Sequence, residues 1–163
     1  EYQRLDNNTK LKLINKEKTV VSDFIKNPIV IRNKYNINKE EITEKTLKKL
    51  ILEDLDNFLK ELGTGFSYIE NEYKIKIGNT YNYIDLLLFN YIYNCFIVIE
   101  LKVTELKKEH IGQIQIYTNY VDKNIKTINQ DKTIGVIICK KDNGYYIEYS
   151  SDNRIFSKNY ILS

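Results

Sequence analysis

Three consecutive segments rich in Ile, Tyr, Phe and Val constrain the fold of this chain most strongly. They cover residues 66–77, 81–89 and 95–103. Short turn segments separate them, one with Gly78-Asn79 and the other the stretch from Asn90 to Asn94. β-branched and aromatic residues favour strands, and connections this short join antiparallel neighbours. The sequence therefore predicts a three-stranded meander.

A helix is expected on each side of this meander, over residues 40–62 and 107–125. In both segments apolar positions recur at steps of three and four residues, which makes one buried stripe. Gly63 and Gly65 are expected to end the first helix. The stripes consist of Leu47, Ile51, Leu55, Phe58 and Leu62 in the first helix and of Ile111, Ile114, Thr118, Val121 and Ile125 in the second.

The remaining segments complete an α/β fold. Residues 133–139 form a short continuous apolar run, which is typical of a strand covered on both faces. Residues 142–144 then predict a turn, and residues 145–149 predict a following strand. The element order α-β-β-β-α-β-β indicates a mixed sheet flanked by helices.

The chain is long enough for one such domain, which we place at residues 39–163. Residues 1–38 are polar and Lys-rich, with one apolar island at residues 24–31. We interpret them as a linker or peripheral segment that lies against the core. The chain starts at Glu1 and has no Met. We therefore expect it to follow a missing N-terminal region of the same protein.

Composition excludes some classes of function. A single His and two Cys argue against a zinc site built on several such ligands. Cys95 and Cys139 adjoin apolar runs, as buried free thiols do in a reducing, cytoplasmic compartment. No Gly-Lys-Ser/Thr follows Gly63, which argues against a phosphate loop. The net charge of +3 permits contact with nucleic acid without arguing for it.

Three charged residues interrupt the predicted core strands. Asp85 lies in one strand, and Glu100 and Lys102 lie in the next. Side chains alternate along a strand, so Glu100 and Lys102 share a face. If the chain turns around Ile92, Asp85 lies across from residue 99 or 100. The pattern predicts two carboxylates and an ammonium at one point of the sheet.

Two acids this close favour a divalent cation between them, Mg²⁺ or Mn²⁺. Such a cation polarises a phosphodiester and activates a bound water, while Lys102 orients or deprotonates that water or stabilises developing charge. The alternative interpretation is a buried salt bridge, in which Lys102 neutralises Asp85 or Glu100.

Polar residues flank the apolar stripe of the second helix. His110, Gln113 and Tyr117 follow one another at steps of three and four residues. Gln113 and Tyr117 are candidates to bond phosphate or sugar oxygens near the metal. The alternative is that these side chains simply face solvent, and we interpret His110 as a surface or boundary residue.

These residues carry a family resemblance. Asp85 followed by Glu100-Leu101-Lys102 resembles the D…(D/E)XK signature of the restriction-endonuclease-like superfamily, and Gln113…Tyr117 resembles the QxxxY element of its RecB-like branch. The chain resembles the C-terminal domain of the YhcG-type nucleases in particular. The segments that carry this likeness are 24–30, 58–66, 83–89, 98–102, 109–113 and 133–140.

The resemblance implies a restriction-endonuclease-like fold, a divalent metal and DNA as substrate. It implies metal ligation by Asp85, Glu100 and the carbonyl of Leu101, with Lys102, Gln113 and Tyr117 in catalysis. It also implies that the missing N-terminal region is helical and DNA-binding-like, and it allows a homodimer. A module on the same fold that binds nucleic acid or assembles without cleaving is the alternative function.

The first helix departs from the superfamily pattern, in which a Glu often faces the metal. By its distance from Gly63, the expected position of that acid is Lys48. Glu44 lies one turn earlier on the same face, and Glu53 matches an acidic family position although it lies off the apolar stripe. We expect Glu53 or Glu44 to complete the site.

Overall fold

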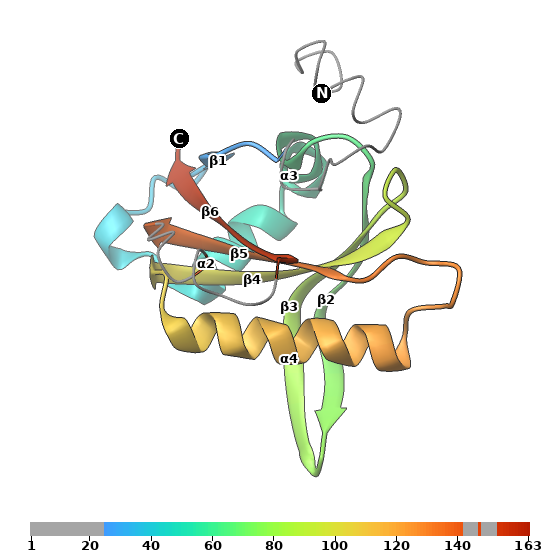
Figure 1. The fold of residues 1–163 in the computed structure, drawn as a ribbon. Helices are drawn as coiled ribbons and strands as arrows, with labels where there is room; N and C mark the ends of the chain where they lie inside the picture. The colour runs from blue at the N-terminus through green and yellow to red at the C-terminus, as the bar shows by residue number, and fades with distance from the viewer. Residues whose placement is uncertain (1–24, 142–146, 148–152) are drawn as a thin grey trace.

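The computed structural model describes residues 25–141, Ile147 and residues 153–163. Within this part of the chain, one mixed sheet of six strands has the order β1-β6-β5-β4-β3-β2 (Figure 1). The strands are β1 (Ile29–Ile31), β2 (Phe66–Ile77), β3 (Thr80–Asn90), β4 (Cys95–Glu105), β5 (Ile134–Lys141) and β6 (Ile155–Leu162).

The meander that the sequence predicts is confirmed. β2, β3 and β4 pair antiparallel, and β4, β5, β6 and β1 continue the sheet in parallel. The parallel connection from β4 to β5 runs through helix α4 (Lys108–Asn124), as a parallel pair requires. β4 is therefore the boundary between the antiparallel and parallel halves of the sheet.

Helices cover both faces of the sheet (Figure 1). Helices α2 (Glu44–Leu52) and α3 (Leu55–Leu62) pack with Leu86, Leu88 and Ile99 in one apolar cluster. Helix α4 packs with Leu87 and Val98 in a second cluster. The restriction-endonuclease-like mixed sheet flanked by helices is thereby observed.

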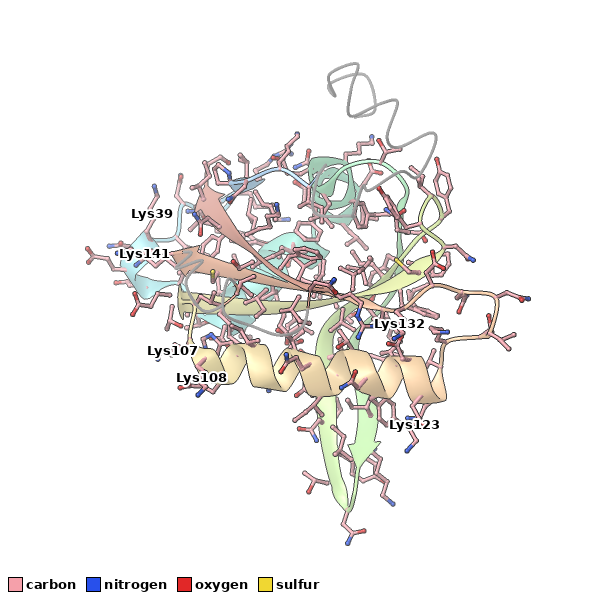
Figure 2. The ribbon with its side chains drawn as sticks, in the orientation of Figure 1. Lys39, Lys107, Lys108, Lys123, Lys132 and Lys141 are labelled. Atoms are coloured by element: carbon pink, nitrogen blue, oxygen red, sulfur yellow. The ribbon has the colours of Figure 1, made fainter. Side chains whose placement is uncertain are left out.

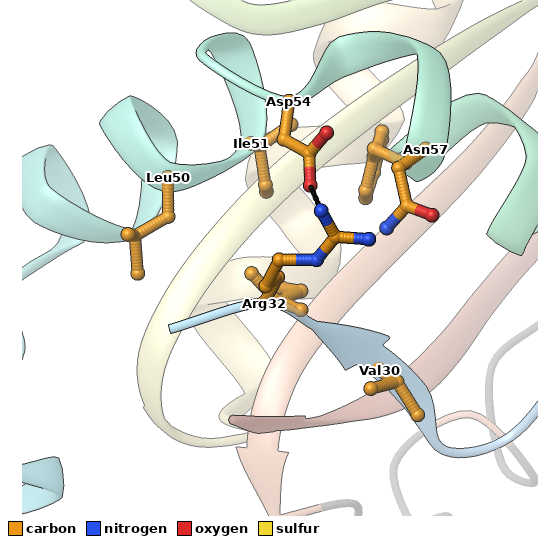
Figure 3. Close-up of a pocket in the computed structure, with 8 residues that line it drawn as sticks. Val30, Arg32, Leu50, Ile51, Asp54 and Asn57 are labelled. Carbon is orange, nitrogen blue, oxygen red and sulfur yellow. Dashed lines mark ion pairs between the residues drawn. The ribbon is translucent and has the colours of Figure 1, made fainter. Parts of the chain in front are cut away.

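The single helix expected over residues 40–62 is wrong. A 3-10 turn at Lys39–Glu41 precedes α2. The helix is interrupted at Asp54, whose φ of −138° and ψ of 44° are not helical. Arg32 reaches Asp54 across this break, 3.5 Å away (Figure 3). Contacts with the loop after β1 thus override the helical preference of this segment. The apolar repeat continues through the break, so it does not reveal that one residue has non-helical dihedral angles.

The strand order of the C-terminal region also needs correction. The expected order contains neither β1 nor β6, both of which belong to the sheet. In the expected strand 145–149, only Ile147 is described, and it is helical and packs beside the α4 cluster. The other four positions and the expected turn at 142–144 lie outside the described residues. The middle of β6, Ser157-Lys158-Asn159, is polar, so neither alternation nor an apolar run reveals this strand.

Of the segment expected to be peripheral, residues 25–38 are described, and they include strand β1 with Ile29 and Ile31 buried. No described helix is long and apolar enough to cross a membrane.

Candidate active site

The charged residues of the strands meet where the sheet splits. The antiparallel pairing of β3 with β4 runs from Asn90 and Cys95 to Leu86 and Ile99. One further step brings Asp85 across from Glu100, as the sequence predicts. Beyond this point β3 stays with β2, and the two strands form a hairpin that projects from the body (Figure 1). β4 stays with β5.

Two crossed hydrogen bonds hold the carboxylates at this split. Glu100 Oε2 accepts from the backbone N–H of Asp85 at 2.8 Å. Asp85 Oδ2 accepts in turn from the backbone N–H of Leu101, also at 2.8 Å. The side chains thereby satisfy donors that the diverging strands leave without a ladder partner. The split in the sheet fixes the position of both acids.

Glu100 is held in a desolvated position. Its residue is 4% exposed. Burial, and then the neighbouring Asp85, raises the pKa of Glu100 to about 8, against the opposing effects of the Asp85 N–H, Lys102 and Lys48. Without a further cation this carboxyl group therefore keeps its proton at neutral pH.

The α2 side of the split contributes a lysine. Lys48 Nζ lies 2.9 Å from Asp85 Oδ1 and also contacts the Glu72 carboxylate. Burial lowers the pKa of Lys48, but hydrogen bonds to Glu72 and then Asp85 outweigh it, so the pKa lies above its ordinary value. At the position where the superfamily pattern predicts an acid, the structure has an ammonium group.

Glu72 is the residue of this cluster that the sequence reasoning missed. The strand pairs Asn71–Leu86 and Tyr73–Ile84 bracket it opposite Asp85. Its φ of 49° is unusual for a residue with a side chain. Counting outward from the Gly78-Asn79 turn gives the same pairing, so hairpin register was the signal that could have found it.

Lys102 lies on the face of Glu100, as strand alternation requires. In the described part of the chain it forms no ion pair within 4.0 Å, and its charge acts on Glu100 and His110. The salt bridge considered as an alternative, between Lys102 and one of the acids, is therefore not formed there. Lys48 pairs with Asp85 instead.

Helix α4 brings a phenol toward the carboxylates. Tyr117 is buried, and its hydroxyl accepts a hydrogen bond of 3.0 Å from Gln113 Nε2. Burial, then the negative charge of Glu100, raises the pKa of Tyr117. Tyr117 thus lies beside the site rather than in solvent, and Gln113 orients its hydroxyl.

His110 has a local structural contact at the start of α4. Its Nδ1 accepts from the backbone N–H of Lys107 at 3.1 Å, within a capping box. Burial, then the charge of Lys102, lowers the pKa of His110. It is a boundary residue next to the site, as expected from the sequence.

The two acids expected from the first helix lie elsewhere. Glu53 is the C-cap of α2, contacts the Tyr35 hydroxyl and lies 2.8 Å from Lys34 Nζ. Glu44 is exposed in the first turn of α2, where its charge acts on His110 and Tyr160. The structure gives neither acid a contact with Asp85 or Glu100 among the described residues.

The donor set at the split fits one divalent cation. No group of three or more His, Cys, Asp or Glu residues is placed to hold a metal ion among the residues that the structure describes. Mg²⁺ sites, however, use one or two carboxylates and complete their shell with water and phosphate oxygens. Asp85 and the buried Glu100 supply such a pair, and a cation would compensate their mutual repulsion.

Comparison with protein families gives one match over most of the chain. The model of the family described as YhcG PDDEXK nuclease domain matches residues 22–162. The chain is also similar to the protein YhcG of Escherichia coli (strain K12), whose name gives it only as a candidate nuclease. The two are 26% identical over 101 residues, which are 62% of this chain and 27% of that protein. The chain thus spans about a quarter of this relative.

Two solved structures are similar in fold. The structure of the EndoMS–dsDNA2 complex has a TM-score of 0.52 and 16% identity, covering 76% of this chain and 48% of that one. The structure of EndoMS in apo form has a TM-score of 0.51 and 16% identity, covering 73% and 46%. At this identity the likeness shows the shared fold.

Proposed function

The chain belongs to the YhcG PDDEXK nuclease domain family, and from this membership and the geometry of the split sheet we propose that it hydrolyses phosphodiester bonds of DNA with Mg²⁺ or Mn²⁺. The observation that carries the proposal is the pair of crossed hydrogen bonds that presents Asp85 and Glu100 together beside Lys102. Two fixed carboxylates next to an ammonium group are what metal-assisted phosphodiester hydrolysis needs.

Each residue has a distinct role in this proposal. Asp85, Glu100 and the carbonyl of Leu101 would hold the cation, and a bound cation would supply polarisation of the phosphate and a more acidic water. Glu100 would hold the cation as a carboxylate and would therefore release its proton to solvent on binding, since a metal-ligating carboxyl group must be deprotonated. Lys102 would orient the attacking water as an ammonium group, or would accept the proton of that water as the neutral amine, or would stabilise the charge that develops on the phosphate oxygens.

Gln113 and Tyr117 assist from α4. The hydrogen bond between them fixes the phenol next to Glu100. From there the hydroxyl can donate to a phosphate oxygen or to a water of the cation. Their role is to position substrate rather than to transfer the proton of the nucleophile.

The projecting β2–β3 hairpin offers a surface for the substrate strand. On one face Lys74 pairs with Tyr83 and Lys76 with Tyr81. Both tyrosines are about half exposed, and Lys74 Nζ lies 4.1 Å from the Tyr81 ring centroid. By strand alternation this face continues from Glu72 and Asp85. Ammonium groups suit phosphates, and exposed tyrosines suit bases for stacking.

A second set of lysines lies where α4 begins. Lys107 and Lys108 stand at this end of the helix in Figure 2, whereas Lys123 stands near its other end. The backbone N–H of Leu106 donates to the Lys141 carbonyl, which keeps Lys141 beside them. If a bound nucleic acid strand extends from the site past Lys102, its phosphates would come close to these lysines.

A module that binds nucleic acid without cleaving it is the second candidate function. The Lys48–Asp85 ion pair favours it, because an ammonium group already compensates one of the two carboxylates. Lysines on the hairpin and around α4 serve binding equally well with or without hydrolysis. Metal binding therefore distinguishes the two functions.

Calorimetric titration of Mn²⁺ into the wild type and the Asp85→Asn variant tests the proposal. We expect binding by the wild type, loss of binding in the variant, and Mn²⁺-dependent cleavage of DNA by the wild type alone. Asp56→Asn is the matched control, because the Asp56 side chain is 86% exposed and, among the described residues, pairs only with its helix neighbour Lys60. Equal binding by all three proteins, with no cleavage, would favour the non-cleaving module.

A further inference from the structure

Lys48 is held between two carboxylates that come from different strands. Its Nζ lies 2.9 Å from Asp85 Oδ1 and contacts Glu72 Oε1. The Lys48 side chain is 16% exposed, whereas its neighbour Lys49 is 61% exposed. Helix α2 anchors it through Leu47 and Ile51, which are fully buried. The ammonium group is thus a fixed part of the site.

Both oxygens of Asp85 are already engaged. Oδ1 faces Lys48, and Oδ2 accepts from the Leu101 N–H. The hydrogen bond from the Leu101 N–H joins the two strands at the split, and breaking it would separate the strands further. A divalent cation that binds Asp85 through Oδ1 must share that oxygen with Lys48, and one that binds through Oδ2 still lies close to the same ammonium group, so the two cations repel each other.

Glu72 provides a second partner on the side away from Glu100. It lies on β2 opposite Asp85 of β3, and its side chain is 48% exposed. Its left-handed backbone conformation, φ 49°, is one that residues with side chains adopt rarely and that concentrates at functional sites. An ammonium group displaced from Asp85 therefore keeps a carboxylate partner with little movement of its stem.

We propose that Lys48 is a built-in counter-ion that competes with the divalent cation for Asp85, and that Glu72 retains its ammonium group when the cation binds. The inference rests on the proposed metal-dependent function. Metal binding is then an exchange of cations at Asp85 rather than the filling of an open site.

Calorimetric titration of Mn²⁺ into the full chain carrying Lys48→Gln, Glu72→Gln or both changes tests this exchange. Removing the competing charge tightens Mn²⁺ binding by about tenfold or more, given the strength of charge interactions at partly buried sites. Glu72→Gln leaves Lys48 with Asp85 as its main partner and weakens Mn²⁺ binding severalfold. The double variant binds as tightly as Lys48→Gln, because the effect of Glu72 acts through Lys48.

Two variants of the same helix serve as controls. Lys49→Gln removes the same charge from the next residue and leaves Mn²⁺ affinity within about twofold of wild type, since exposed charges are screened. Lys48→Arg keeps the charge and gives an affinity no higher than that of the wild type. It also supports the test if Lys48→Gln fails to fold, which circular dichroism of each variant establishes.

Each contrary outcome has a distinct meaning. Unchanged or weaker Mn²⁺ binding by Lys48→Gln overturns the competition. Weaker binding by Glu72→Gln in both backgrounds makes Glu72 a metal ligand instead. Failure of the wild type, Lys48→Gln and the double variant to bind Mn²⁺ removes the metal centre itself, and the proposed function with it. Binding by Lys48→Gln and the double variant but not by the wild type supports the competition and shows that Lys48 blocks the site in the wild type.

Discussion

The two walls of the charged site solve the same electrostatic problem differently. The wall formed by β4 and α4 buries Glu100 beside Asp85 and leaves Lys102 outside any ion pair in the described part of the chain. The wall formed by α2 and β2 pairs Asp85 with the ammonium group of Lys48, which Glu72 also contacts. In the β4–α4 wall the buried Glu100 has no ion-pair partner among the described residues, whereas in the α2–β2 wall Asp85 is paired with an ammonium group.

The two walls are therefore expected to have different roles: the β4–α4 wall supplies the groups for chemistry, and the α2–β2 wall controls metal binding. A buried acid with a raised pKa has an electrostatic reason to take up a cation. The half-buried ion pair between Lys48 and Asp85 instead opposes binding of a cation, because the ammonium group already occupies that position. The β4–α4 wall follows the sequence signature of the family, whereas the α2–β2 wall departs from it. Variants on the first wall should affect chemistry, and variants on the second should affect affinity for metal.

Lys102→Ala gives the largest expected effect and is the strongest test of the first wall. Cleavage of DNA should fall by about 10³-fold, the usual scale for losing a proton-transfer or charge-stabilising group. Folding and DNA binding should remain close to wild type, because Lys102 forms no ion pair within the described residues. Cleavage kinetics, a thermal melt and a DNA-binding titration measure the three quantities.

Lys132→Ala is the control for this variant, since Lys132 is exposed in the connection from α4 to β5 (Figure 2). Both proteins should melt at the same temperature. If Lys102→Ala unfolds instead, Lys102 serves to stabilise the fold, and the contrast between the walls disappears.

Glu100→Gln gives the next largest effect, on stability against pH. The unfolded chain loses the Glu100 proton near pH 4.5, and the folded chain, in which burial and Asp85 raise the pKa, loses it near pH 8. Between these values only the folded state keeps the proton, so this group's contribution to stability falls as pH rises and is lost above about pH 8. The variant should lack this fall and melt roughly 5 °C higher than wild type at pH 8.

Mn²⁺ sharpens the same experiment. A cation bound at the acids favours ionised Glu100, so it should raise the melting temperature of the wild type most at high pH and leave the variant nearly unchanged. If the melting temperatures of the two proteins change in parallel from pH 5 to 8, the pKa of Glu100 is not raised in the folded state, and the β4–α4 wall holds no destabilised acid.

The sequence predicted the first wall well because strands have simple geometry. Alternation places Glu100 and Lys102 on one face, and turn lengths place Asp85 opposite Glu100 within one residue. Helical spacing likewise joined Gln113 with Tyr117. These relations depend on residues close in sequence or paired by one short turn. The confirmed meander and the α4 helix follow from the same local rules.

The second wall depends on how a helix packs, which local patterns do not determine. The helix breaks at Asp54, and an ion pair with Lys34 of the loop after β1 holds Glu53. The match to an acidic family position selected Glu53 for the site, although the folded chain keeps it elsewhere. Glu72 was within reach of hairpin counting, but its role became visible only with Lys48 beside it.

Tyr117→Phe gives the smallest expected effect and locates the edge of the first wall. The ring stays packed, and only the hydroxyl and its 3.0 Å hydrogen bond from Gln113 are lost. Stability should change by about 1 kcal/mol or less, the net value of one hydrogen bond. Cleavage should fall by roughly tenfold with unchanged Mn²⁺ affinity, because the phenol positions substrate without binding the cation.

Gln113→Leu should lower cleavage to a similar extent, and the double variant should be no worse than either single one, since the two side chains act through one hydrogen bond. Additive losses would mean that Gln113 and Tyr117 contact the substrate separately. A loss of Mn²⁺ affinity in Tyr117→Phe would move the boundary of the metal centre onto α4, and the β4–α4 wall would then control metal binding as well as chemistry.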